Sequence, residues 1–156
     1  MTDRAEDMKG YDDARRALQN AIEFHEIKTP HMFEALLEKI IADARSNLQN
    51  NGSVVRGQLL ASIKILDRLG DLDAVVGSDL EYAYWVENGR GIVEPVNAKV
   101  LHWVDKVTGE DVFAMRSGPS EPMPFLEPAV IENTEPFPEI VVTAWSDAAN
   151  SARSLR

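Results

Sequence analysis

Residues 31–48 carry apolar side chains in two rows, each repeating at every fourth position. One row is Met32, Leu36, Ile40, Ala44 and Leu48, and the other is Phe33, Leu37 and Ile41. On a helix the two rows lie side by side and form one wide apolar stripe. Thr29 is a good N-cap, Pro30 suits the first helical position, and Asn50-Asn51-Gly52 can end the helix. The sequence therefore predicts a long amphipathic helix that buries one face.

A second helical pattern precedes this one, from Tyr11 onward. Its apolar members are Ala14, Ala17, Leu18, Ala21 and Ile22, and His25 extends the same stripe. We expect Lys28-Thr29-Pro30 to separate the two helices. Residues 1–10 show no such pattern, so we expect them to form a flexible N-terminus. Residues 11–156 then form a single domain, because a chain of 156 residues with 44% apolar composition can bury its own core.

The hydrophobic period changes to two in the middle of the chain. Ile63 and Ile65 alternate with polar neighbours, Gly70-Asp71 is a turn signal, and residues 72–77 return. This pattern predicts a β-hairpin. Residues 99–104 and 112–116 predict a second hairpin around a turn that contains glycine.

Shorter helical segments flank the two predicted hairpins. They are a turn capped by Ser53, residues 81–88, residues 125–133, and a final helix over residues 140–154 after the chain-breaking Pro136 and Pro138. The predicted fold class is α+β. Long N-terminal helices pack on a small antiparallel sheet of about four strands, with short helices after the hairpins and a C-terminal helix.

The charge of the chain excludes several classes of protein. There are 26 acidic and 16 basic side chains, and residues 71–140 hold 14 of the acids but only 4 of the bases. An acidic chain lacks the basic footprint that general DNA or RNA binding needs. The absence of Cys excludes disulfides and thiolate zinc sites. We expect no membrane span and no secretory signal, because the apolar runs are too short.

The residues that could carry chemistry do not form a recognisable constellation. His25, His31 and His102 are 6 and 71 residues apart, and metal ligands usually lie closer together in the sequence. Asp71 and Asp73 are too few oxygen ligands for a calcium loop. We therefore expect no catalytic residues, no cofactor and no metal, and hence a protein that is not an enzyme.

Five short motifs follow one another between residues 31 and 133. They are Gly-Gln-Leu-Leu-Ala-Ser-Ile at 57–63, Tyr-Ala-Tyr-Trp-Val-Glu-Asn-Gly at 82–89, Asn-Ala-Lys-Val-Leu at 97–101, Val-Phe-Ala at 112–114 and Pro-Met-Pro-Phe-Leu-Glu-Pro-Ala at 122–129. In this order they resemble the neck or tail-completion proteins of lambda-like long-tailed bacteriophages, the head–tail joining family. Arg90 departs from the family pattern, which usually has Thr after this glycine.

The resemblance implies a structural virion protein of the head–tail connector, which assembles as a homo-oligomeric ring. Its partners would be copies of itself and the neighbouring neck, portal or stopper, and tail-terminator proteins. The protein would be made in the bacterial host cytoplasm and end up in the virion. We expect the acidic residues 71–140 to line part of a DNA passage, because like charge repels phosphate and DNA then passes without specific binding.

Several side chains in the motif region are candidates for an interface or a core anchor. Tyr and Trp bury large areas with few rotatable bonds, and closely spaced prolines make the Phe-Leu pair a rigid apolar anchor. The candidates are Tyr82, Trp85, Glu87, Arg90, Trp103, Pro124, Phe125 and Leu126. We expect Phe125 to lie in the core.

Two other functions remain open at this point. An acidic protein of this size could mimic DNA and inhibit an enzyme with a basic cleft. Alternatively, the chain could be a small soluble enzyme whose site the sequence does not reveal.

Overall fold

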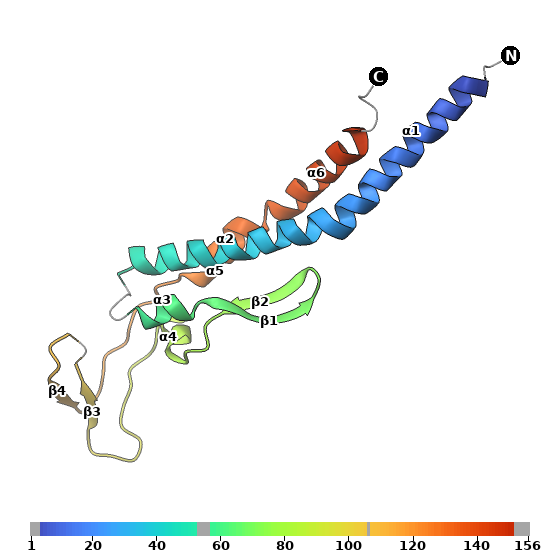
Figure 1. Cartoon of the computed structure of the whole chain (residues 1–156). Coiled ribbons are helices and arrows are strands. Elements are labelled where there is room, and N and C mark those ends of the chain that lie inside the picture. Colours follow the sequence, from blue (N-terminus) through green and yellow to red (C-terminus); the bar gives the residue numbers. More distant parts are fainter. Residues whose placement is uncertain (1–3, 53–56, 106, 152–156) are drawn as a thin grey trace.

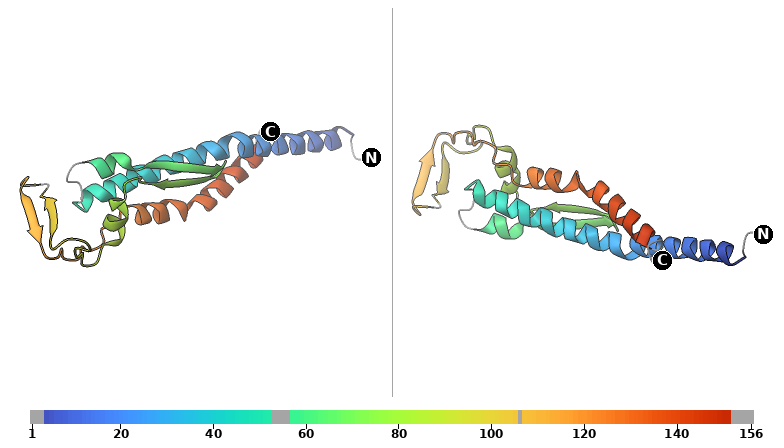
Figure 2. Two further views of the ribbon diagram at one scale, coloured as in Figure 1. Left: turned by 90° about the horizontal axis from the view of Figure 1, so that it is seen from below. Right: turned by 90° about the horizontal axis from the view of Figure 1, so that it is seen from above.

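A computed structural model describes residues 4–52, 57–105 and 107–151. The protein is elongated (Figures 1 and 2): one long helical rod forms its spine, two further helices run along the rod, and a β-hairpin projects from the end that lies far from the N-terminus. The elements are α1 (Arg4–Glu23), η1 (Phe24–Lys28), α2 (Thr29–Asn50), α3 (Gln58–Ser62), β1 (Lys64–Gly70), β2 (Asp73–Gly77), α4 (Tyr82–Asn88), β3 (Leu101–Val104), β4 (Asp111–Ala114), α5 (Leu126–Thr134) and α6 (Phe137–Ser151).

The α+β class is confirmed, but the four strands do not form one sheet. β1 pairs with β2 and β3 pairs with β4, both antiparallel, and the two hairpins are separate sheets. The physical reason is the connection between them: α4 and an extended segment carry the chain from the side of the rod to its end before β3 begins (Figure 1). In the first hairpin Gly70 pairs with Asp73, so the loop is Asp71 and Leu72, one residue later than the Gly70-Asp71 signal.

The separation of the first two helices at Lys28-Thr29-Pro30 was a wrong prediction, because a π-helical turn, η1, joins α1 directly to α2. Thr29 is helical (φ −62°, ψ −46°), and both its backbone N–H and its Oγ1 donate to the carbonyl of Phe24. Phe24 and Thr29 are both buried, five positions apart. In a regular α-helix this spacing would turn one of them away from the core, and the wider π turn keeps both on the same face.

Two helix starts also differ from their predictions. α1 begins at Arg4 rather than Tyr11, while the flexibility expected for residues 1–10 stays a prediction. α6 begins at Phe137, because Pro138 fits the first helical turn, where a backbone N–H has no partner in any case. The predicted turn at Ser53 lies outside the described residues.

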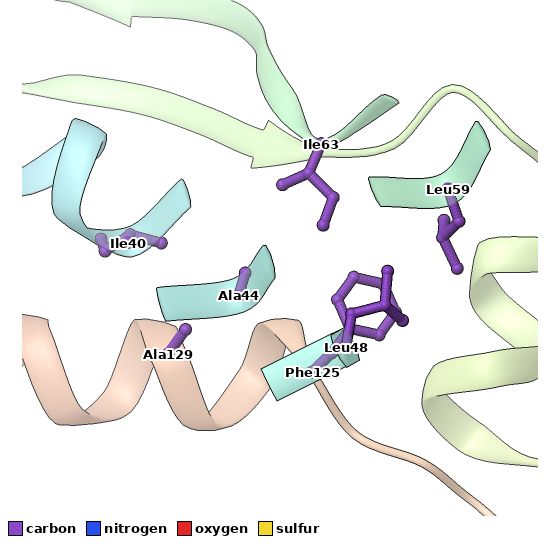
Figure 3. Packing of buried hydrophobic residues seen from close by; sticks show 7 residues of the cluster. All are labelled: Ile40, Ala44, Leu48, Leu59, Ile63, Phe125 and Ala129. Carbon is purple, nitrogen blue, oxygen red and sulfur yellow. The ribbon is translucent and has the colours of Figure 1, made fainter. Parts of the chain in front are cut away.

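The core lies where α2, α3 and α5 meet, and it is small. Its members are Ile40, Ala44, Leu48, Leu59, Ile63, Phe125 and Ala129 (Figure 3). Ala44 and Ala129 are both fully buried, so α2 and α5 approach closely. Farther along the rod, Phe33 and Phe137 place their ring centroids 6.4 Å apart and continue the contact between α2 and α6. The amphipathic helix predicted from residues 31–48 is confirmed.

Candidate functional site

Glu87 joins the end of α4 to the beginning of α5. Its Oε2 accepts hydrogen bonds from the backbone N–H groups of Phe125 (2.9 Å) and Leu126 (3.0 Å), and its Oε1 accepts one from Glu127 (2.8 Å). The first N–H groups of a helix have no partner inside the helix and carry a partial positive charge, so a carboxylate is a favourable acceptor there. Phe125, at the N-cap position, provides no side-chain cap of its own. The contact therefore fixes Phe125 where it is 2% exposed.

Gly89 allows two chain segments to cross directly after α4. Its φ is +71°, and a Cβ at this position would lie 2.6 Å from the carbonyl oxygen of Ser120. Only glycine fits such an approach without strain. Beyond Gly89, Arg90 exchanges two backbone hydrogen bonds with Ser120, at 3.0 and 2.9 Å, and Val93 exchanges two with Ser117, at 3.0 and 2.8 Å.

These four hydrogen bonds form the base of a projecting segment that we call the arm, residues 90–120. The arm carries the β3–β4 hairpin at its far end, away from the helices (Figures 1 and 2). The guanidinium of Arg90 adds a hydrogen bond to Ser117 Oγ at 2.7 Å across the same base. The direction in which the arm leaves the molecule is thus fixed by its base.

A groove of about 530 Å³ lies beside the base of the arm, and we call it the α4 groove. It is lined by Gly52, Tyr82, Trp85, Val86, Arg90, Ser120, Glu121 and Met123. The Trp85 side chain is 50% exposed, and its ring packs edge-on against Tyr84 at 5.1 Å. The lining of the α4 groove is thus mostly apolar and aromatic, and its charged members are Arg90 and Glu121.

The β3–β4 hairpin has apolar side chains on both faces. Register pairs His102 with Phe113, whose rings stack at 4.6 Å, and Phe113 is 65% exposed. Because side chains alternate along a strand, Trp103 lies on the opposite face, where it is 40% exposed. The Nε2 of His102 also contacts Asp111 Oδ1 at 2.7 Å.

Polar contacts on the surface join the first hairpin to α2, and α2 to α5. Arg68 on β1 holds Glu34 on α2 through two hydrogen bonds, of 2.5 and 2.7 Å, and its hydrogen bond lowers the pKa of the Glu34 carboxyl. Lys39 and Asn133 both donate to Asp43, at 2.6 and 2.8 Å, and these hydrogen bonds lower the pKa of Asp43.

The predicted interface and anchor residues fall into four groups. Phe125 is in the core as expected, and Leu126 packs against it. Tyr82, Trp85 and Arg90 come together in the α4 groove, whereas Trp103 lies far from them on the arm. The remaining two candidates connect neighbouring segments: Glu87 caps α5, and the carbonyl of the exposed Pro124 accepts a hydrogen bond from Asn51.

The sequence did not predict that several apolar side chains are exposed in the folded chain. On the arm these are Val104, Phe113 and Met115, and on the helices they include Tyr11, Leu18 and Trp145. The alternation of the β4 sequence could have revealed Phe113. What is exposed on a helix, however, depends on whether a neighbouring helix covers it.

The described part of the chain offers no group of three or more His, Asp or Glu side chains placed to hold a metal ion. Within those same residues, no helix has the length and apolarity needed to cross a membrane.

Comparison with known proteins gives one family. Residues 15–89 match the family model described as "Bacteriophage HK97-gp10, putative tail-component". The matched stretch runs from the middle of α1 to the glycine after α4, so it includes most of the rod, the first hairpin and the Tyr82–Gly89 motif. Comparison with curated proteins gives no match, and comparison with solved structures gives none. The family match supports a phage neck or tail family and indicates a structural tail component.

Proposed function

Because residues 15–89 match this phage tail-component family, we propose that the protein is a structural part of the head–tail connector and assembles as a homo-oligomeric ring between head and tail. In this role it is not an enzyme, and its binding partners are copies of itself and the adjoining neck, portal or stopper, and tail-terminator proteins. Its place is the head–tail junction of the virion.

The exposure of all three tryptophans is the observation that supports assembly most strongly. Trp85, Trp103 and Trp145 are between 40% and 50% exposed, although they lie on three different elements. Tryptophan is mostly buried in monomeric proteins and is enriched at the centres of interfaces. A subunit that is covered by neighbours on several sides would bury all three.

The helix α1 supports the same proposal. Tyr11 and Leu18 lie seven positions apart on one face of α1 and are 70% and 63% exposed. The opposite face packs on α6, where Asn20 Nδ2 donates to the carbonyl of Ala148 at 3.3 Å. A helix with exposed apolar side chains on one face gains stability when another chain packs against that face.

The acidic residues of the segment 71–140 are consistent with the DNA passage that we propose for the ring. Twelve of the fourteen acidic side chains in this segment are exposed. If they line part of the passage, like charge keeps the phosphate backbone away from the wall, and DNA passes without being bound. Carboxylates confined to the outer rim of the ring would contradict this part of the proposal.

The proposal is tested by light scattering on the purified protein, alone and mixed with the neighbouring neck and tail proteins of the same phage. We expect a defined ring, whose mass is a whole-number multiple of the subunit mass. A chain that stays monomeric with every one of these partners would contradict the proposed function.

A further inference from the structure

We infer that the tip of the arm of one subunit seats in the α4 groove of the next subunit around the ring. The inference rests on the proposed ring, and it names the two surfaces that meet. The occupant of the groove is thus a second copy of this chain.

The first argument is that the hairpin has exposed apolar side chains on both faces. An antiparallel sheet with one face in water alternates apolar and polar residues. Here Phe113, Val104 and Met115 lie on one face, between 50% and 73% exposed, and Trp103 lies on the other. A two-stranded hairpin that stands alone is only marginally stable in water. These side chains fit a hairpin that is inserted between other surfaces.

The second argument is that the arm does not reach its own groove. Arg90 and Ser120 belong both to the groove wall and to the hydrogen-bonded base of the arm. The base therefore sends the chain away from the groove, and the hairpin stands apart from the helices in every view (Figures 1 and 2).

The third argument is charge complementarity between the acidic tip and Arg90 in the groove. Arg90 forms no ion pair with any residue that the structure describes, and its guanidinium donates a hydrogen bond to Ser117 Oγ. The tip of the arm carries three acidic residues, Asp105, Glu110 and Asp111, and one basic residue, Lys106. Asp105 holds the turn by accepting the N–H groups of Val107 and Thr108, and Asp111 contacts His102. Glu110 is exposed and is the carboxylate best placed to pair with Arg90 of a second copy.

The fourth argument is the placement of the two surfaces. The arm and α4 lie at the same end of the elongated subunit (Figure 1). Because the two surfaces differ, their contact is head-to-tail, and contacts of this kind form a ring when the rotation closes. Each subunit then gives one arm and receives one arm.

Charge reversal tests the contact. Arg90→Glu and Glu110→Arg should each move assembly, measured by sedimentation velocity, to a protein concentration roughly tenfold higher or more, because like charges then face each other. The double variant R90E/E110R should restore assembly. Lys99→Glu and Glu94→Arg make the same charge changes on the arm outside the tip and the groove, and they should leave assembly unchanged. Equal effects of the test and control variants would overturn the inference.

Cross-linking gives a second test, which does not depend on charge. The natural chain has no Cys, so every disulfide must involve the introduced residues, Thr108→Cys at the tip or Glu121→Cys in the groove. A mixture of the two single variants should give linked pairs of unlike chains, and the double variant should give a ladder of linked chains. Thr108→Cys mixed with Glu38→Cys, which lies on α2 outside the groove, should give no linked pairs.

The outcomes separate the inference from the proposed function. Rings without a link between positions 108 and 121 would overturn the inference and leave the proposed function intact. Links between two tips would also overturn it. So would a tip that forms a disulfide only with another neck protein. A chain that forms rings and the linked ladder but never joins other neck proteins would support the inference and contradict the proposed function.

Discussion

The carboxylate of Glu87 on α4 accepts the backbone N–H of Phe125 at 2.9 Å, although the two residues are 38 positions apart in the chain. This contact connects the core to the base of the arm. On one side of it Phe125 is buried between α2 and α3, and on the other side Gly89 begins the crossing from which the arm leaves. The direction of the arm thus depends on how α4 is fastened to α5.

Replacing Glu87 should weaken this fastening. Glu87→Gln leaves one oxygen to accept from three N–H groups and places an amide donor against the others. We expect the free energy of unfolding to fall by about 1–3 kcal/mol, the usual effect of unpaired donors. Urea denaturation followed by tryptophan fluorescence measures it. Glu81→Gln, at an exposed position just before the same helix, is the control and should change stability by less than ~0.5 kcal/mol. Equal losses in both variants would contradict the capping role.

A side chain at Gly89 should disturb the crossing at the base of the arm. In Gly89→Ala the new Cβ would meet the Ser120 carbonyl oxygen at 2.6 Å, at a φ of +71°. We expect a loss of about 1–3 kcal/mol, because backbone strain and a steric clash add. Gly91→Ala is a matched control, since a Cβ there meets nothing within 4 Å. Thermal unfolding of both variants decides the matter, and an unchanged midpoint for Gly89→Ala would show that the crossing is not constrained.

The small core should be sensitive to lost volume. Leu48 is fully buried among Leu59, Phe125 and the α2–α5 contact. Leu48→Ala should lower the free energy of unfolding by about 2–5 kcal/mol, through lost burial and the cavity that remains. The same substitution at Leu69, which is 64% exposed on β1, is the control. If both substitutions had the same small effect in denaturant titrations, the assignment of the core would be wrong.

The contribution of Asp43 to the stability of the folded protein should depend on pH. Hydrogen bonds from Lys39 and Asn133 lower its pKa in the folded protein below the usual 3.8. The stabilisation is therefore fully present above the unfolded value and is lost as the pH falls through the lower folded value. The difference in stability between wild type and Asp43→Asn should be constant near neutral pH, begin to shrink near pH 3.8, and continue to shrink as the pH falls through the lower pKa of the folded protein. Denaturation at several pH values checks this, and a difference that grows on acidification would have the wrong sign.

Much of the helix and hairpin arrangement could be predicted from local patterns. The apolar rows of α2 and the turn signal at Gly70-Asp71 each depend on neighbouring residues. The helix and the hairpin are both confirmed, with the turn one residue later, at Asp71-Leu72. The π turn could not be predicted in this way. It becomes evident only when Phe24 and Thr29 are known to share one buried face. In the sequence, Pro30 indicates the start of a new helix rather than a continuous rod.

The candidate site could be predicted only in part, because it is built from contacts between residues that are far apart in the sequence. The capping role of Glu87 needed the position of α5, and the division into two sheets needed the path of the segment between β2 and β3. The motif resemblance nevertheless brought together Tyr82, Trp85 and Arg90, which the structure places in one groove. What the sequence pattern missed was the apolar second face of the hairpin on the arm.

A cryo-EM reconstruction of the virion neck tests the central claim most directly, because it shows the position of the chain and its contacts together. We predict a closed ring of this protein at the head–tail junction, in which the arm of each subunit crosses to the α4 groove of the next. A neck without this chain, or with single copies that do not touch one another, would contradict the account.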